Sequence, residues 1–485
     1  MKPDKYQQAV IDAYRDTSKN IFISATAGAG KTSTLVELSK RTPPTKNSIF
    51  LAFNKSIAEE LGRKLPPTIK AQTLHGCALS ALKQAHSLKF TIKENKYYTF
   101  AQEILEREKV HRKRIPSLSM QMCRLFDLMR FNLVFDGVKE VVELAERYGE
   151  ECTETMAQRA ITLAKTAEMS AKAFFSAGAV GTVPMDFTDM LLWAVNWVPN
   201  NAWKRYSVVM VDECQDISPL QYKLIQKIKS PTGRLIAVGD EKQSIYSFQG
   251  SNLDSLKSIK EAPNTITLPL SMTYRCSRAV VDEANGVFPN GIEAAPFAED
   301  GAVYDGSVYD AREGDFILCR NNAPLVSTWL KLVKAGRRCV IMGKEFGDEL
   351  IQLIDGVDDP LYLENELIAM QERLRAKGYE HPERCEPYAK LDEKIGIILD
   401  LYGYFGDMQT VRNRIYDIFV ENQENRGVIL STIHKSKGLE AERVFFLQPS
   451  LIPSKFATTE LAMYAEKCLR FVAITRAKRE LIYVE

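Results

Sequence analysis

A glycine-containing segment near the start of the chain, AlaThrAlaGlyAlaGlyLysThr at Ala25–Thr32, limits the possible folds more than any other part of the sequence. It follows an apolar run at Ile21–Ile23 and precedes Leu35 and Leu38, which recur at helical spacing. A strand, a tight turn and a helix in this order form a phosphate-binding loop in parallel α/β domains, because the N–H groups that open the helix attract anions. The sequence therefore predicts an α/β domain that binds a phosphorylated ligand, although the usual first glycine of the loop is Ala25 here.

The residues of this loop have separate expected roles in binding ATP. The backbone N–H groups that would surround the phosphate oxygens belong to Ala27, Gly28, Ala29 and Gly30. Lys31 would reach the β and γ phosphates, and the hydroxyl of Thr32 would hold Mg²⁺. The expected cofactors are therefore ATP and Mg²⁺.

A second segment supplies the acids that ATP hydrolysis needs. The apolar run Val208–Val211 predicts a buried parallel strand, and AspGluCysGlnAsp at Asp212–Asp216 follows it directly. Ligands bind at the carboxyl ends of such strands. Asp212 would hold Mg²⁺, and Glu213 would orient or deprotonate the attacking water. The alternative is a strand that simply ends in a polar turn.

Further blocks follow the order found in one family of motor proteins. They are AlaPheAsnLys at Ala52–Lys55, ThrLeuHisGly at Thr73–Gly76, and the blocks at Ala237–Gly250, Leu270–Arg275, Thr432–Glu440 and Phe471–Lys478. Together with the two segments above, these blocks resemble the motifs of the UvrD/Rep-like helicases of superfamily 1. GlnSerIleTyr within the third block and LysGlyLeuGlu within the fifth favour the A-type branch, whose members move 3′ to 5′ along single strands.

The resemblance implies an α/β fold with two RecA-like parallel-sheet motor domains, each interrupted by a mainly helical insertion. Alternating strand and helix signals agree with this organisation. We expect motor domain 1 at residues 1–79 and 185–270 around insertion 1 at 80–184. Motor domain 2 would occupy residues 271–345 and 427–485 around insertion 2 at 346–426.

The family pattern also implies how ATP is handled, with the nucleotide held between the two motor domains. Gln243 would sense the γ phosphate or its attacking water. Arg275 and Arg476 would act as arginine fingers that stabilise charge on the phosphate oxygens in the transition state. For an isolated arginine the alternative is a surface ion pair.

The base and the ribose would be read by other residues of the same pattern. Gln7 would read the adenine, with Gln8 as the alternative, while Tyr274 would stack on the base and Glu440 would contact the ribose. Many relatives place an arginine over the base at the position of Ser33. Ser33 therefore predicts looser base selectivity.

Single-stranded DNA would cross the motor domains on aromatic and polar side chains, because stacking on aromatic faces suits every base. The expected stacking residues are Phe53, Phe187, Tyr246 and Phe248. The expected phosphate or sugar contacts are Asn54, Thr73, His75 and His434. Phe53 could instead be a core residue, and the two histidines could be structural. The basic run at Arg107–Arg114 either grips duplex or forms a solvated helix face.

Composition sets limits on partners and compartment. In a chain of 485 residues, no apolar stretch approaches the roughly 20 residues of a membrane span, and no signal-peptide core follows Met1. We expect a cytoplasmic protein of a bacterial or phage-infected cell, without a membrane partner. The nine cysteines form no Cys-x2-Cys pair, so neither zinc nor a disulfide framework is indicated. A net charge of +2 gives no general basic field, so nucleic acid would be held by stacking and local contacts.

Three functions are compatible with these features. The leading one is a 3′ to 5′ DNA helicase acting in replication, recombination or repair on single strands and single/double-strand junctions, with a recombinase or single-strand-binding protein as a further partner. The alternative is a translocase that strips bound proteins with little unwinding, and it is favoured because no wedge hairpin follows the last block before Glu485. A third is a nucleotide-switched clamp, and the complete catalytic acids argue against it.

Overall fold

The computed structural model describes residues 3–52, 54–86, 88–148, 150, 152–176, 182–245, 253–375, 380–421 and 427–485. The chain forms two compact units, residues 1–272 with 459–465 and residues 273–458 with 466–485. Each unit contains a parallel β-sheet and a helical segment inserted into it. This confirms the predicted fold class, while the domain boundaries drawn from the sequence stay predictions.

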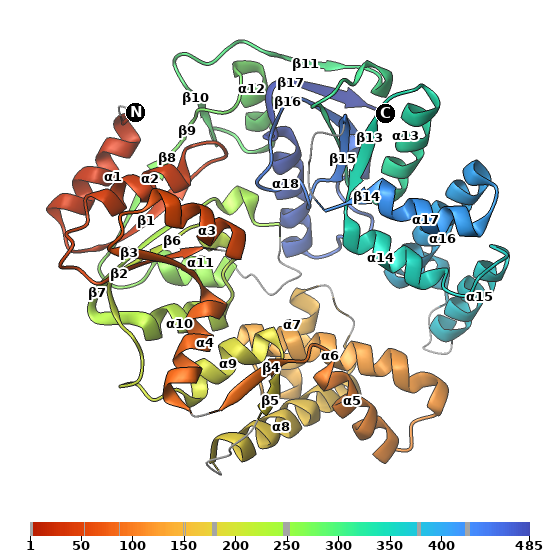
Figure 1. The fold of residues 1–485 in the computed structure, drawn as a ribbon, viewed down its shortest axis with the longest axis horizontal. Helices are drawn as coiled ribbons and strands as arrows, with labels where there is room; N and C mark the ends of the chain where they lie inside the picture. The colour runs from red at the N-terminus through yellow and green to blue at the C-terminus, as the bar shows by residue number, and fades with distance from the viewer. Residues whose placement is uncertain are drawn as a thin grey trace. The chain divides into compact units, whose positions relative to one another are not determined.

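The first unit is built on a six-stranded parallel sheet in the order β3-β2-β6-β7-β1-β8 (Figure 1). Its strands are β1 (Asn20–Ala25), β2 (Ser48–Ala52), β3 (Ile69–Thr73), β6 (Tyr206–Val211), β7 (Lys229–Gly239) and β8 (Thr265–Leu270). Every residue of β2 is buried, as expected for a parallel strand between two layers of helices. Because all six strands run the same way, the loops after β1, β6 and β7 meet at one edge.

Helices cover both faces of this sheet. One face packs on α1 (Lys5–Asp16), α2 (Lys31–Lys40) and α3 (Lys55–Lys64). The other face packs on α4 (Leu74–Ala85), α9 (Phe187–Trp197), α10 (Pro219–Ile228) and α11 (Leu253–Lys260). Side chains alternate between the two faces along each strand, so Phe22 joins the second core and Ile23 the first.

The insertion in the first unit has a hydrophobic core of its own. Its helices are α5 (Lys96–Arg107), α6 (Ile115–Asn132), α7 (Val138–Arg147) and α8 (Glu154–Ser176). Leu105, Met122 and Ala160 are completely buried between these helices. Two short parallel strands, β4 (Lys89–Ile92) and β5 (Thr182–Met185), pair where the chain enters and leaves this helical segment.

The second unit contains a seven-stranded parallel sheet in the order β11-β17-β16-β12-β15-β13-β14. Its strands are β11 (Ala302–Asp305), β12 (Phe316–Cys319), β13 (Cys339–Met342), β14 (Phe419–Val420), β15 (Val428–Thr432), β16 (Ala441–Leu447) and β17 (Ala477–Val484). Strand β14 lies inside residues 346–426, where the sequence predicts an insertion, yet it pairs with β13. The end of the inserted segment therefore belongs to the sheet.

The helices of the second unit pack against this sheet and against each other. They are α12 (Arg278–Val287), α13 (Asn322–Lys334), α14 (Lys344–Leu353), α15 (Tyr362–Arg375), α16 (Glu386–Phe405), α17 (Met408–Ile418) and α18 (Glu460–Ile474), the last belonging to this unit from Glu466 on. One core joins Ile317 and Leu430 of the sheet to Leu325, Ile398 and Ile415 of the helices. A short sheet of β9 (Met272–Thr273) and β10 (Glu293–Ala294) lies where this unit begins.

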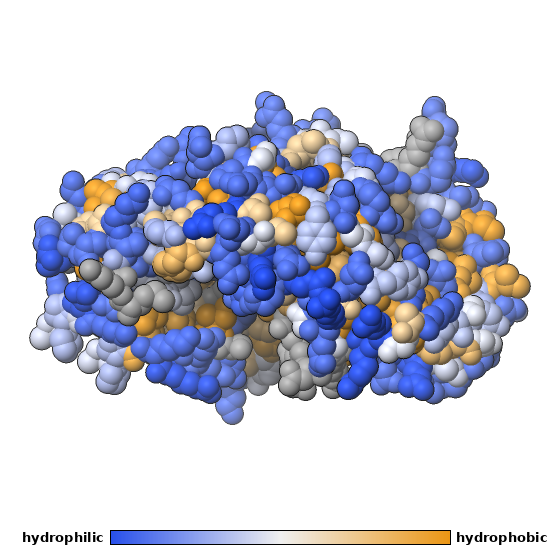
Figure 2. Space-filling view, turned by 90° about the horizontal axis from the view of Figure 1, so that it is seen from above, coloured by the Kyte–Doolittle hydropathy of each residue, from blue (hydrophilic) through white to orange (hydrophobic). Residues whose placement is uncertain are grey.

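Hydrophilic residues cover most of the face seen in Figure 2, and hydrophobic residues form small separate patches on it. Such scattered apolar groups are ordinary on a protein surface. Among the described residues, no helix is both long enough and apolar enough to cross a membrane.

Candidate functional site

The predicted phosphate loop is a tight turn between β1 and α2. Gly28 and Gly30 have φ values of 68° and 74°, a left-handed conformation that glycine adopts without strain. The N–H of Ala29 donates to the carbonyl of Thr26 at 3.3 Å, which closes the turn. Lys31 is the first residue of α2, so the loop ends where the N-terminal dipole of a helix favours an anion.

Two contacts join this loop to the acids that follow β6. The Nζ atom of Lys31 lies 3.0 Å from Oε2 of Glu213. The hydroxyl of Thr32 donates to Oδ2 of Asp212 at 2.5 Å. Strand β7 separates β1 from β6 in the sheet, so the turn and the acidic loop reach across the edge to meet. The structure thus brings together the four residues to which the sequence assigns phosphate binding, metal binding and the orientation of the attacking water.

Burial and neighbouring charges shift the pKa values of these residues. Burial, followed by the charge of Glu213, raises the pKa of Asp212 to about 6. Burial alone would lower the pKa of Lys31. The nearby carboxylates of Glu213, Asp240 and Asp212 outweigh the effect of burial and raise the pKa of Lys31. The ammonium of Lys31 therefore lies among several acids, and added positive charge would stabilise them.

The oxygen atoms of Thr32 and Asp212 fit a magnesium site. A hydroxyl and a carboxylate in contact are hard oxygen donors, and Mg²⁺ typically takes one or two protein oxygens and completes its octahedron with water and substrate phosphates. Among the described residues there is no larger cluster of acids, histidines and cysteines that could hold a metal by itself. The predicted metal ligands therefore suit an ion that arrives with a nucleotide.

The backbone at Glu213 is unusual for a residue with a side chain. Its φ and ψ are 51° and 42°, in the left-handed region that non-glycine residues seldom adopt. Its N–H donates to Oδ1 of Asp212 at 2.9 Å, which helps to hold this conformation. Strained backbone of this kind is concentrated at functional sites, where the surrounding contacts maintain it.

Gln215 belongs to this site, although the sequence analysis gave it no role. Its Nε2 donates to Oε2 of Glu213 at 2.7 Å, and its Oε1 accepts from the N–H of Asp240 at 3.0 Å. The side chain is completely enclosed and joins the loop after β6 to the loop after β7. Its place in the AspGluCysGlnAsp block, two residues after Glu213, was the only available signal.

Gln243 lies in a short 3-10 helix, η3 (Glu241–Gln243), just after β7. Its buried Nε2 donates to Oδ2 of Asp240 at 2.7 Å. Asp240 is one of the carboxylates that act on Lys31. Gln243 is therefore linked to the phosphate loop through Asp240, and its role as a γ-phosphate sensor stays a prediction.

The two candidate adenine-reading glutamines have different surroundings. Gln7 forms a capping box with Asp4 at the start of α1, and a Cβ added to Gly30 would lie 3.3 Å from its Nε2. Gln8 is exposed and donates to Asp12 at 3.0 Å instead. The structure thus places Gln7, and not Gln8, beside the phosphate loop, while Ser33 is exposed on α2. Their contacts with a base stay predictions.

The predicted nucleotide residues of the second unit also lie close together. The Nε atom of Arg275 lies 2.5 Å from Oε2 of Glu440, and its Nη1 donates to the carbonyl of Thr475 at 3.3 Å. Burial acts to raise the pKa of Glu440, but Arg275 and then Lys478 prevail and lower it. Glu440 is therefore held as a carboxylate beside the first predicted arginine finger.

The other predicted finger and the base-stacking residue have distinct surroundings. Arg476 is only 1% exposed and donates to the carbonyls of Val472 and Leu439 at 3.1 Å each. It is therefore part of the packed interior of this unit, and its role as an arginine finger stays a prediction. The ring of Tyr274 stacks near that of Phe297, with centroids 6.1 Å apart, and Phe297 is 74% exposed.

Two of the predicted DNA contacts in the first unit begin helices. The Asn54 side chain accepts from the N–H of Ile57 at 2.8 Å, and Thr73 accepts from Gly76 at 3.0 Å. These bonds are ordinary N-caps, so both residues have a structural role whatever they bind. Phe53, Tyr246 and Phe248 lie outside the described residues.

His75 and Phe187 form an aromatic pair, with ring centroids 5.9 Å apart and planes at 89°. Burial lowers the pKa of His75, which favours the neutral ring. Phe187 is 49% exposed. Both residues line a cavity of about 660 Å³ that also borders Asp212, Glu213 and Asp216. The structure thus places a predicted DNA-stacking residue on the same cavity as the predicted metal ligand.

His434, in the second unit, is partly buried. Burial, followed by the charges of Arg320 and Lys437, lowers its pKa to about 3. The imidazole is therefore neutral near pH 7 and does not offer a positive charge to a phosphate. Its predicted DNA contact and its structural alternative both stay open.

Comparisons with known proteins agree with this geometry. The UvrD/REP helicase N-terminal domain matches residues 4–264, and the UvrD-like helicase C-terminal domain matches residues 409–484. F-box DNA helicase protein 1 of Schizosaccharomyces pombe is 24% identical over an alignment of 515 residues, covering 98% of this chain and 56% of that protein. The chain thus spans about half the length of this relative.

Shorter stretches resemble bacterial helicases more strongly. ATP-dependent DNA helicase Rep of Buchnera aphidicola is 33% identical over 115 residues, which cover 22% of this chain and 17% of Rep. ATP-dependent DNA helicase PcrA of Staphylococcus aureus is 30% identical over 119 residues, which cover 23% of this chain and 16% of PcrA. Since the first domain match alone covers more than half of the sequence, the chain belongs to the UvrD/REP helicase family.

Proposed function

We propose that this chain is an ATP-dependent DNA motor that moves 3′ to 5′ on single-stranded DNA and unwinds duplex. The observation that carries the proposal is the pairing of the phosphate loop with the acids after β6, Lys31 with Glu213 and Thr32 with Asp212. Family membership supports the coupling of such a site to DNA, and relatives named DNA helicases match along the chain.

In this proposal each buried group near the phosphate loop has one task. Lys31 binds the β and γ phosphates, and Thr32 and Asp212 hold Mg²⁺, which when bound neutralises charge on the phosphate oxygens. Glu213 accepts a proton from the attacking water. Gln215 holds the Glu213 carboxylate in place through its 2.7 Å hydrogen bond.

Residues of the second unit complete the proposed reaction. Arg275 and Arg476 stabilise negative charge on the transferring phosphoryl group. Tyr274 stacks on the base, Glu440 contacts the ribose, and Gln7 of the first unit reads the base edge. The single strand is gripped by stacking on Phe187 and on the other aromatic residues of the DNA-contact blocks.

The first test combines ATP hydrolysis and strand separation. We expect single-stranded DNA to stimulate hydrolysis strongly, unwinding to occur only from duplexes with a 3′ tail, and Lys31→Ala to abolish both. Stimulated hydrolysis without unwinding would support the translocase that strips bound proteins. Unwinding from a 5′ tail alone would contradict the polarity, and hydrolysis that ignores DNA would contradict the motor itself.

A further inference from the structure

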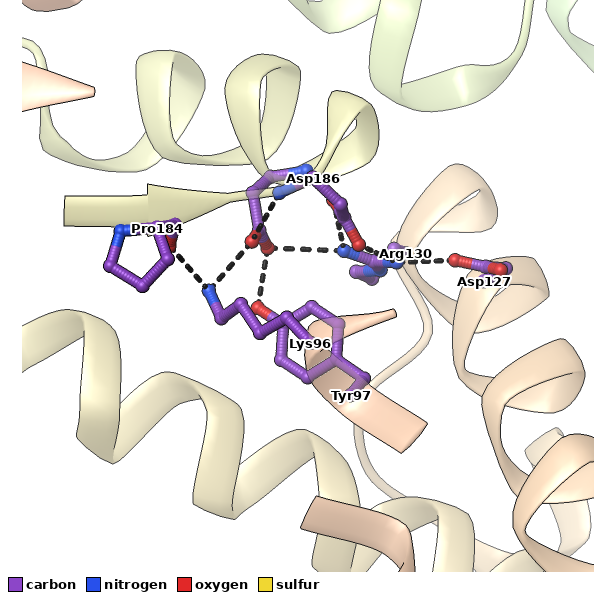
Figure 3. Close-up of polar contacts among 7 residues, drawn as sticks. Lys96, Tyr97, Asp127, Arg130, Pro184 and Asp186 are labelled. Atoms are coloured by element: carbon purple, nitrogen blue, oxygen red, sulfur yellow. Dashed lines mark hydrogen bonds and ion pairs between the residues drawn. The ribbon is translucent and has the colours of Figure 1, made fainter. Parts of the chain in front are cut away.

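A buried cluster of charged side chains joins the helical insertion of the first unit to the first turn of α9 (Figure 3). The guanidinium of Arg130, on α6, is 2% exposed and binds Asp186 with two nitrogens, Nη1 to Oδ1 and Nη2 to Oδ2, both at 2.8 Å. Its Nη1 also donates to Oδ1 of Asp189 at 3.0 Å, and Asp127 of its own helix binds Nη2. One arginine thus holds two aspartates of another element.

A second cation and a hydroxyl reach the same aspartates from α5. The Nζ atom of Lys96 lies 2.8 Å from Oδ2 of Asp189 and 3.2 Å from the carbonyl oxygen of Pro184. The hydroxyl of Tyr97 donates to Oδ1 of Asp189 at 2.5 Å. Figure 3 shows these side chains converging on the turn that begins α9. Two helices of the insertion therefore hold this turn.

The two aspartates are also the capping residues of α9. Asp186 is the N-cap, and its Oδ1 accepts from the N–H of Asp189 at 2.6 Å. In return, Oδ2 of Asp189 accepts from the N–H of Asp186 at 3.2 Å. A capping box already stabilises the helix start without further partners. The cations of the insertion therefore also fix the position of the start of α9 relative to α5 and α6.

Stability alone is a poor explanation for this arrangement. Buried ion pairs lose much of their attraction to desolvation, and well-packed apolar residues in their place are often as stable or more so. Paired charges do fix the relative orientation of the two elements, because a bidentate arginine–carboxylate pair is geometrically specific. Phe187 and Thr188 lie between the anchored aspartates. Phe187 is 49% exposed, and its aromatic neighbour in the described structure is His75, whose ring is perpendicular to its own.

We infer that Arg130, supported by Lys96 and Tyr97, positions Phe187 for stacking on a base of single-stranded nucleic acid. The inference rests on the proposed function. Phe187 is too exposed for packing alone to hold it in one position. The ion pairs of the insertion instead hold the turn that carries it. Arg130 is a positioning residue and touches no nucleic acid itself. The helical insertion thereby influences how tightly the first unit binds single-stranded nucleic acid.

The test measures the concentration of single-stranded DNA that gives half-maximal stimulation of ATP hydrolysis by the full chain. The probe is an oligothymidylate of about 20 nucleotides, longer than one binding site. We expect Arg130→Met and Phe187→Ala each to raise this concentration about tenfold, the size expected for one lost base stack. Thermal unfolding of each variant is recorded alongside.

The matched control is Arg159→Met. Arg159 also forms an ion pair between helices of the insertion, with Nε 2.7 Å from Oε2 of Glu108, but this pair joins α8 to the end of α5 and does not reach α9. We expect this variant to need the same DNA concentration as the wild type. An equal rise in Arg159→Met and Arg130→Met would show a general weakening of the insertion and would overturn the inference.

A double-mutant cycle separates positioning from a merely structural effect. If Arg130 acts through Phe187, the Arg130→Met change adds nothing once Phe187 is alanine. Independent, additive losses would overturn the inference. Should Arg130→Met fail to fold, Tyr97→Phe removes one hydrogen bond without changing charge, and its smaller loss must vanish in the Phe187→Ala background in the same way.

Failure of this inference is distinguishable from failure of the proposed function. If DNA does not stimulate the wild type, the proposed function is wrong. If DNA stimulates the wild type but Arg130→Met responds normally, the positioning role is wrong and the motor function stands. If Phe187→Ala also responds normally, the stacking role of Phe187 is wrong as well.

Discussion

The hydroxyl of Thr32 and the carboxylate of Asp212 share a 2.5 Å hydrogen bond, although 180 residues separate them in the chain. The contact exists because β1 and β6 run in parallel, so the turn after one and the acids after the other lie at the same edge of the sheet. Removing either partner should therefore disturb metal binding before it disturbs the fold.

Thr32→Ala removes the hydroxyl of this pair. We expect ATP hydrolysis to fall by about 100-fold or more, because a lost ligand misplaces the ion that stabilises the transferring phosphoryl group. Thr32→Ser keeps the oxygen and should retain most of the activity. A magnesium titration of both variants checks the cause, since alanine should raise the concentration needed and serine should not. If Thr32→Ala shows the same magnesium dependence as the wild type, Thr32 is not a ligand of the metal.

Gln215→Met tests the link between the loops after β6 and β7. Methionine keeps the size of the side chain but removes its hydrogen bonds to the N–H of Asp240 and to the carboxylate of Glu213. We expect kcat for ATP to fall about tenfold with little change in KM, because Glu213 loses its orientation, and stability to fall by about 1–3 kcal/mol. Exposed Gln8→Met serves as the control. An unchanged kcat would make Gln215 purely structural.

Arg275→Ala should lower ATP hydrolysis by about 1,000-fold, as expected for a lost arginine finger, while nucleotide binding is much less affected. Arg278→Ala is the matched control, three residues further on. Arg278 is exposed and pairs with Asp300 at 2.6 Å, so its loss should change hydrolysis little. Single-turnover hydrolysis of ATP compares the two variants. Similar rates in both would count against the arginine-finger role of Arg275.

His434 should make the protein sensitive to acid. Its pKa in the folded chain is lowered to about 3, while an unfolded chain keeps the ordinary value near 6.5, so stability is full above pH 6.5 and is lost as the pH falls toward 3. Between pH 7 and pH 5 the wild type should lose about 2 kcal/mol from this group. His434→Gln should lose correspondingly less.

Urea unfolding at both pH values, followed for the wild type and His434→Gln, measures this difference. His111→Gln, at an exposed histidine of the insertion, is the control and should behave as the wild type. An identical pH effect in the wild type and His434→Gln would show that the imidazole is solvated.

Local patterns determined the parts of this protein that depend on neighbours in sequence. The strand at Asn20–Ala25, the glycine turn and the helix from Lys31 were predictable because a phosphate loop needs an apolar strand, residues that tolerate positive φ, and a helix start within a few positions. The strand before Asp212 and the order of the motif blocks were equally visible. They were sufficient for the fold class and for family membership.

Only the tertiary structure decided which of these residues touch. Gln215 looked like one polar residue among several until the edge of the sheet brought Asp240 to it. Arg130 carried no signal for its role, because the two aspartates of α9 that it binds lie 56 and 59 residues away and a local pattern cannot locate them. The sequence specified the chemistry that the chain carries, and long-range packing specified the contacts through which that chemistry is held in place.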